Sequence, residues 1–369
     1  MVRLMIRLCR RLGWWIGYAL LYPITAYFFL FSRGARGVSR RYLDRALGRP
    51  ARARDVFRHF FVFSCVILDR IYLLTGELHR YHVRLVGLED LTGAIAGGTG
   101  CVLFGSHLGS FEVLRVAAAR ECPVRFKALM YRAHTGALTG AIEQLNPGLS
   151  GDVIEIGRPD AMLRVRECVG RGEIVGILAD RAPESHRRLF APFFGELAAF
   201  PTGPLIAAAA LGVPVVLFFA VRTGPRCYEV RFQRFAERID LGETRRDVRL
   251  QHYVERYAAR LEAQCRADPY NWFNFYDFWE SARDDASRPL ATLAARDSAG
   301  PGEHRGPAME RGRADADAGF GAAEPRHVPR GEDDRGAEPA GAGQRDPRLR
   351  AAVASREAHA ASATGGPGR

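Results

Sequence analysis

Short apolar segments of strand length alternate with segments of helical length between residues 101 and 222. The strand-like segments are rich in Val, Ile, Leu and Phe, which is typical of strands buried on both faces. Because parallel strands need crossover connections, this alternation indicates an α/β fold with a largely parallel sheet flanked by helices. The expected strands are 101–105, 124–131, 152–157, 173–180 and 213–222, and the expected helices are 110–120, 135–146, 159–172 and 203–212.

After residue 222 the chain is expected to add a strand and a helix to this core, and then to continue as a tail without a core-forming pattern. Residues 227–235 are expected to pair with 213–222 as a hairpin, and 245–266 to form a long helix. After Trp279 the hydrophobic periodicity stops, and we expect 285–369 to be a disordered tail. The predicted organisation is therefore an N-terminal membrane anchor with a basic flank (1–50), an α/β domain (51–284) and the disordered tail (285–369).

An uncharged run occupies residues 12–32 and has arginines on both sides. A helix of this length spans about 31 Å, roughly one bilayer core. Its Trp and Tyr side chains suit the membrane interface, and Pro23 would kink it. No small-residue cleavage site follows, which argues against a signal peptide. Membrane attachment is favoured over a buried core helix, and both a spanning helix and one lying in the cytoplasmic leaflet remain open. A second apolar helix is expected within 51–78, starting near Asp55 as its cap.

The formal net charge of +12 belongs to residues 1–284, because acidic and basic side chains balance in 285–369. A negatively charged partner is therefore expected: a membrane, an acidic protein or phosphate. No nucleic-acid-binding module is recognisable, so we expect no nucleic-acid partner. The seven cysteines are scattered without a C-x-x-C pair, so we expect neither a disulfide framework nor a zinc site. This cysteine pattern favours a reducing compartment. No cofactor is expected.

The segment GSHLGSFE, residues 105–112, follows the first strand of the alternation. Ligands of open α/β sheets bind outside the carboxyl ends of strands, so His107 lies where a reacting group would be expected. The pKa of an ordinary histidine, about 6.5, suits proton transfer at neutral pH. A carboxylate on the other ring nitrogen would set the tautomer, and a turn before the helix could bring Glu112 to that position. The pattern indicates a histidine–carboxylate pair for general base catalysis.

Other chemistries fit the sequence less well. Ser106 and Ser110 lack the G-x-S-x-G context of a serine hydrolase. The glycines at 97, 98 and 100 precede the strand, so they indicate a turn and not a nucleotide-binding loop. His79 and His82 have no further ligands nearby in the sequence, and we expect no metal site.

The segment around His107 resembles the histidine–acid motif of the lysophospholipid acyltransferase-like enzymes, and more closely that of the branch that adds secondary acyl chains to lipid A. The resemblance covers most of residues 1–280 and extends to four other segments. These are the apolar N-terminal run, Met130–Arg132, the LAD segment ending at Asp180, and APFFGELAAFPTG, residues 191–203. PYNWFNFYDFW, residues 269–279, is similar to the aromatic ending of the same branch. We call residues 269–279 the aromatic segment.

The resemblance implies a glycerolipid-acyltransferase-like fold and transfer of an acyl chain from a thioester to a hydroxyl without an acyl-enzyme. His107 would be the general base and Glu112 would orient it. Donor or acceptor polar groups would be held by Arg132, Asp180 and Arg181. The acyl site would be shaped by Phe193, Phe194 and Gly195, with Gly203 opening the following helix. The implied donor is acyl carrier protein or coenzyme A, the acceptor a lipid or glycolipid, and the location the cytoplasmic side of a bacterial inner membrane.

Two positions depart from the patterns of the related enzymes. Arg181 stands where the lipid A branch usually has Gln, which leaves the acceptor open. Thr202 and Gly203 follow Pro201 where the glycerolipid branch usually has Glu-Gly, which argues against a glycerol-phosphate acceptor. An aryl-polyene or other specialised lipid pathway remains an alternative, and so does a non-catalytic membrane scaffold of the same fold.

Overall fold

A computed structural model describes residues 11, 13–114, 124–130, 153–181 and 187–279. The chain divides into two compact units, 1–322 and 323–369, and all the described residues belong to the first. Three predictions lie outside the described residues: the helix at 135–146, the site residue Arg132 and the disordered tail at 285–369. Of the helix expected at 110–120, the structure describes helical residues 111–114.

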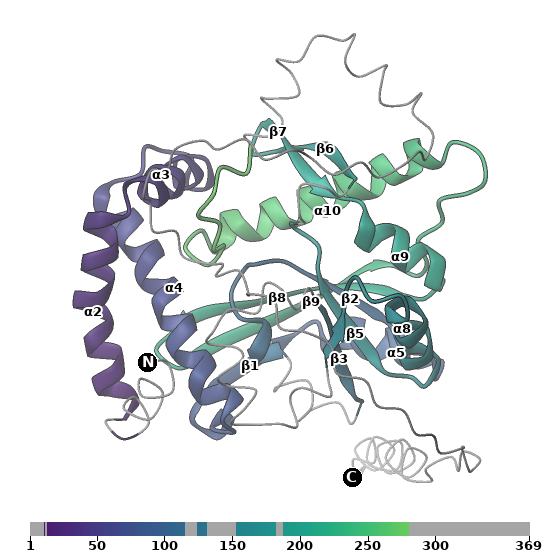
Figure 1. Cartoon of the computed structure of the whole chain (residues 1–369), viewed down its shortest axis with the longest axis horizontal. Helices are drawn as coiled ribbons and strands as arrows, with labels where there is room; N and C mark the ends of the chain where they lie inside the picture. The colour runs from purple at the N-terminus through teal and green to yellow at the C-terminus, as the bar shows by residue number, and fades with distance from the viewer. Residues whose placement is uncertain (1–10, 12, 115–123, 131–152, 182–186, 280–369) are drawn as a thin grey trace, which may run out of the picture. The chain divides into compact units, whose positions relative to one another are not determined.

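A seven-stranded sheet forms the centre of the fold, in the order β1-β9-β8-β2-β5-β3-β4 (Figure 1). All neighbouring strands are parallel except β8 and β9, which form the expected antiparallel hairpin. The prediction of an α/β fold with a largely parallel sheet is thus confirmed. The strands are β1 (His82–Val86), β2 (Val102–Gly105), β3 (Phe126–Met130), β4 (Val153–Glu155), β5 (Ile174–Leu178), β8 (Val215–Gly224) and β9 (Cys227–Ala236).

Helices cover the sheet, and three of them pack together at the N-terminal end of the chain. The apolar run forms α2 (Trp14–Phe31), which packs along α4 (Ala53–Leu74), and α3 (Arg33–Leu47) connects the two (Figure 1). The expected cap of α4 differs, since Asp55 lies in the first turn and accepts the backbone N–H of Arg52 at 2.8 Å. The other helices described are α5 (Leu88–Ile95), α8 (Ala161–Gly170), α9 (Gly203–Leu211), α10 (Arg246–Ala267) and a 3-10 turn at Leu78–Arg80.

A separate antiparallel hairpin of β6 (Arg188–Phe193) and β7 (Glu196–Pro201) packs against α10. Its turn uses positive φ angles at Phe194 (56°) and Gly195 (83°). Sequence patterns do not reveal this hairpin, because its strands lack a regular alternation of buried and exposed residues and Pro192 lies within β6.

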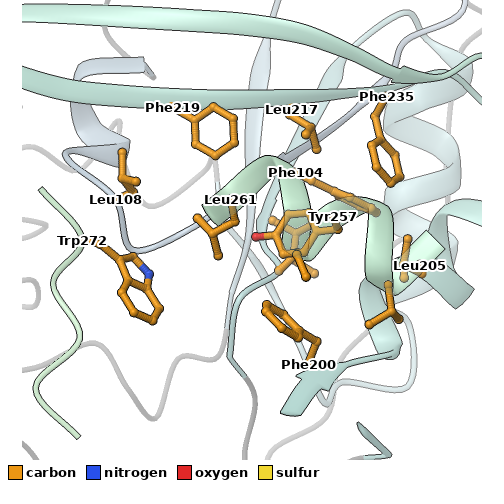
Figure 2. Close-up of a cluster of buried hydrophobic side chains, with 14 of the residues drawn as sticks. Phe104, Leu108, Phe200, Leu205, Leu217, Phe219, Phe235, Tyr257, Leu261 and Trp272 are labelled. Atoms are coloured by element: carbon orange, nitrogen blue, oxygen red, sulfur yellow. The ribbon is translucent and has the colours of Figure 1, made fainter. Parts of the chain in front are cut away.

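Two hydrophobic clusters lie on opposite faces of the sheet, because successive side chains of a strand point in opposite directions. Along β2, Leu103 belongs to one cluster and Phe104 to the other. Figure 2 shows the cluster that contains Phe104, in which Phe104 and neighbouring strand residues face Tyr257 of α10. Trp272 of the aromatic segment is part of the same cluster, so the C-terminal end of the described chain is built into the core.

Candidate active site

The His107 loop leaves the carboxyl end of β2 at the middle of the sheet. Gly105, the last residue of β2, has no room for a side chain, because a Cβ there would lie 2.3 Å from the Phe218 ring. At Gly109 the φ angle is +78°, and a Cβ would meet the carbonyl oxygen of Ala220 at 1.8 Å. Only glycine fits such a position, since it combines left-handed backbone with close backbone approach. Glycine at 105 thus lets β2 pack against Phe218, and glycine at 109 lets the loop turn close to Ala220 just after His107.

Asp180 occupies the equivalent position after the neighbouring strand. Gly105 of β2 and Leu178 of β5 are partners in the parallel register, and His107 and Asp180 each lie two residues beyond them. The register brings the two side chains together: His107 Nδ1 lies 2.8 Å from Asp180 Oδ1. The backbone N–H of His107 donates to Asp180 Oδ2 at 2.9 Å. One carboxylate thus binds both the ring and the backbone of the histidine.

The charges at this pair favour a neutral imidazole next to an ionised carboxylate. Burial raises the pKa of the Asp180 carboxyl, but His107 and Arg181 outweigh it, and that pKa lies well below its usual range. Burial by the surrounding protein, followed by the charge of Arg181, lowers the pKa of His107, against the opposing effect of Asp180. Because an ionised carboxylate can only accept hydrogen bonds, Nδ1 carries the proton and Nε2 has a free lone pair. The imidazole side chain remains 35% exposed, so it is open to a reactant.

Glu112 does not take the place expected for it beside the His107 ring. Its Oε1 lies 2.7 Å from Arg70 Nε of α4, and its Oε2 accepts from Ser110 Oγ at 3.3 Å. The reason is geometric: Asp180 already holds Nδ1, and Arg70 is the cation that α4 presents to the start of the following helix. Glu112 still acts on His107 at longer range, since its negative charge raises the pKa of the imidazole.

Arg181 lies beside the pair and connects it to the aromatic segment. Its Nε is 3.9 Å from Asp180 Oδ2, and its Nη2 donates to the carbonyl oxygen of Phe273 at 2.9 Å. The guanidinium also lies over the Tyr276 ring, 5.3 Å from its centroid. Arg181 is thus fixed near the site, and its side chain is 27% exposed.

The remaining predicted site residues lie around the β6–β7 hairpin. Phe193 is fully buried, with its ring centroid 5.4 Å from that of Trp272 and 5.8 Å from that of Trp279. Phe194 and Gly195 form the hairpin turn, where the backbone N–H of Phe194 donates to a carboxylate of α10. Gly203 begins α9. The structure thus connects Phe193 to the His107–Asp180 pair through the Trp272 side chain.

Trp272 is a residue of the site that sequence patterns do not reveal. Its indole Nε1–H donates to Asp180 Oδ2 at 3.2 Å, and its side chain is fully buried. The available signal was the tryptophan within the aromatic segment, but no spacing rule connects it to a carboxylate 92 residues earlier. Within the described part of the chain, no three His, Cys, Asp or Glu side chains gather where they could hold a metal ion.

A histidine–carboxylate pair between two strand ends is compatible with several reaction types, and the comparison with known families narrows the choice. A family model described as bacterial lipid A biosynthesis acyltransferase matches residues 4–281. The chain belongs to this family. The resemblance inferred from the sequence is confirmed, and with it acyltransferase activity of the general lipid A type. No curated protein matches the chain.

Proposed function

We propose that this family member moves a fatty acyl chain from an acyl thioester to a hydroxyl group of a lipid or glycolipid, with His107 as the general base. The observation that carries the proposal is the 2.8 Å contact between His107 Nδ1 and Asp180 Oδ1. This contact favours the ring proton on Nδ1, and so supports Nε2 as the atom that accepts a proton from an incoming hydroxyl.

In the proposed reaction, Nε2 removes the proton of the acceptor hydroxyl as the oxygen attacks the thioester carbonyl. Asp180 stabilises the imidazolium that forms, because its buried negative charge lies against Nδ1. Collapse of the tetrahedral intermediate breaks the carbon–sulfur bond, and the imidazolium returns its proton from Nε2 to the departing thiolate. The products are an ester and a free thiol, and no acyl-enzyme forms.

The other predicted site residues enter the proposal in supporting roles. Glu112 adds negative charge that favours the imidazolium, and it holds the helix start against Arg70. Arg132 and Arg181 would bind polar groups of the donor or acceptor, and Phe193, Phe194 and Gly195 would form part of the acyl-chain site. Gly203 would set the start of α9 next to that site.

The donor proposed is acyl carrier protein, with coenzyme A as the alternative. The net charge of +12 lies within residues 1–284, which would attract a strongly acidic carrier protein. Both carriers are cytoplasmic molecules, so we place the catalytic domain on the cytoplasmic side of the inner membrane.

Membrane attachment is proposed through α2. This helix has 18 residues and a mean hydropathy of 1.3, long and apolar enough to cross a membrane. One face packs on α4 through Trp14, Gly17, Leu21 and Thr25. The other face exposes large apolar side chains, which include Trp15, Ile16, Leu20, Tyr22, Ile24, Tyr27, Leu30 and Phe31. Exposed arginines of α3 follow directly, and they suit anionic lipid headgroups.

The test compares total lipid extracts by mass spectrometry from cells with the protein, without it, and with His107→Ala. Loss of one acyl chain from a hydroxyacylated glycolipid in the second and third samples would support the proposal and identify the acceptor. Loss of a polyene-type lipid would support acyl transfer but assign the protein to a specialised lipid pathway. Unchanged lipids in all samples would refute acyl transfer and favour a non-catalytic scaffold. Membrane fractionation and circular dichroism of His107→Ala show whether the variant is folded and localised normally.

A further inference from the structure

Residues 271–273 of the aromatic segment pair with the His107 loop through an isolated antiparallel bridge. The backbone N–H of Gly109 donates to the carbonyl oxygen of Asn271 at 2.8 Å, and that of Phe273 donates to the carbonyl oxygen of His107 at 2.9 Å. Leu108 and Trp272 form the antiparallel bridge between these bonds. The backbone pairing therefore fixes where Trp272 lies relative to the catalytic loop.

The Trp272 side chain reaches the catalytic pair through one polar contact. Asp180 Oδ2 accepts the indole N–H at 3.2 Å and the backbone N–H of His107 at 2.9 Å. Asp180 Oδ1 is thereby left to the imidazole Nδ1. Two donors on one oxygen resist rotation of the carboxylate about its Cβ–Cγ bond. Rotation would take Oδ1 away from the ring.

We propose that Trp272 is a positioning residue for acyl transfer, whose indole N–H orients the Asp180 carboxylate so that it can hold and stabilise the His107 imidazolium. This inference rests on the proposed function. It assigns Trp272 no contact with substrate, because its side chain is 0% exposed.

The structure holds Trp272 firmly enough for this role. Its ring packs against Tyr42 of α3 and Phe278, with centroid distances of 5.0 Å to each. Its carbonyl oxygen lies 2.9 Å from His59 Nε2 on α4. A carbonyl can only accept, so His59 Nε2 carries the proton and Nδ1 accepts from Ser39 Oγ at 2.8 Å. Two helices thus fix Trp272 through a chain of hydrogen bonds that ends at Asp180.

Trp279 offers a matched control within the same segment. It is also buried, at 2% exposure, and its indole N–H donates to the carbonyl oxygen of Phe193 at 3.1 Å. Substituting either tryptophan by phenylalanine removes one indole N–H and part of a buried ring. Only the Trp272 substitution removes a hydrogen bond to the catalytic carboxylate.

The experiment measures kcat, KM and the pH profile of kcat for the full-length wild type, Trp272→Phe and Trp279→Phe. The probes are lauroyl- and myristoyl-acyl carrier protein as donors and a hydroxyacylated lipid A precursor as acceptor. For Trp272→Phe we expect kcat to fall by about tenfold or more, since a hydrogen bond to a charged group is lost. KM should stay within about twofold, because the indole touches neither substrate. The acid limb of the profile should move to lower pH, since a carboxylate that can rotate away from the ring stabilises the imidazolium less. Trp279→Phe should show neither the fall in kcat nor the movement of the acid limb.

Equal kcat values and equal pH profiles in the two variants would overturn the inference while leaving acyl transfer intact. A wild type that transfers no acyl chain would instead refute the proposed function on which the inference rests. If Trp272→Phe fails to fold, incorporation of benzothienylalanine at position 272 keeps the ring shape and removes only the N–H. A normal kcat for that folded protein would equally overturn the inference.

Discussion

The buried histidine behind the active site makes the stability of the protein depend on pH in a way that can be calculated. His59 is 0% exposed, and burial lowers its pKa to about 4, against an ordinary value of about 6.5. Above about pH 6.5 the ring is neutral in both the folded and the unfolded chain, so it has no effect on stability there. As the pH falls from about 6.5 to about 4, the unfolded chain takes up a proton that the folded chain does not. Folding is therefore destabilised progressively over that interval, by about 3 kcal/mol in full.

The perturbation is His59→Gln, which keeps a donor for the carbonyl oxygen of Trp272 and an acceptor for Ser39 but does not titrate. Urea unfolding at about pH 7 and at about pH 4.5 gives the free energy of unfolding of each protein. The wild type should lose about 2.5 kcal/mol more than His59→Gln between these two conditions. Carboxylates that titrate elsewhere act equally on both proteins and cancel in this difference.

His252→Gln is the matched control, because this histidine is exposed on α10 and not buried in the fold. Its loss of unfolding free energy with pH should parallel that of the wild type. If the His59→Gln curve also parallels the wild type, then His59 takes up its proton in the folded protein. That result would refute the lowered pKa of His59, because a protonated ring still donates Nε2–H to the Trp272 carbonyl oxygen but cannot accept from Ser39 at Nδ1.

Three further predictions concern the candidate site and the apolar helix α2. Asp180→Asn should lower kcat by at least about a hundredfold in steady-state kinetics without raising KM, because an amide cannot stabilise the imidazolium. A kcat unchanged by this substitution would exclude a role for the carboxylate. Gly109→Ala should lower the free energy of unfolding by about 2 kcal/mol or more in chemical denaturation, since its Cβ would overlap the carbonyl oxygen of Ala220 at a positive φ. A stability equal to that of the wild type would contradict the described loop. Replacing Trp15 and Phe31 together by Ser should weaken co-flotation with anionic lipid vesicles and leave the circular dichroism spectrum unchanged, because both side chains are largely exposed. Unchanged flotation would rule out this face of α2 as the attachment surface.

The parts of the fold that could be predicted from the sequence are those whose signal is local. Burial on both faces gives each central strand an apolar run of its own, so β2, β5 and β8 were predictable without knowledge of their neighbours. The position of His107 at a strand end follows from the same run and from the glycines on either side. The β6–β7 hairpin was missed because its strands show no regular alternation of buried and exposed residues: Pro192 lies within β6, and the last four residues of β7 are all buried.

The partner of His107 could not be predicted, because it depends on which strands are neighbours. Asp180 lies 73 residues away, and its contact with His107 exists only because β5 pairs with β2 in a register that aligns their ends. Sequence spacing favoured Glu112 because it is close along the chain. The ion pair between Glu112 and Arg70 likewise depends on tertiary structure, because it requires α4 to lie beside the helix that starts at residue 111.

Helix α4 contacts both α2 and the His107 loop through two consecutive residues. Asp69 is fully buried and accepts hydrogen bonds from Trp14 of α2 at 2.7 Å and from Tyr228 of β9 at 2.8 Å. Arg70, the next residue, binds Glu112 at the end of the His107 loop. Successive side chains on a helix point about 100° apart, so one turn of α4 can contact α2 on one side and the catalytic loop on another. Helix α4 therefore helps to set the positions of both α2 and Glu112.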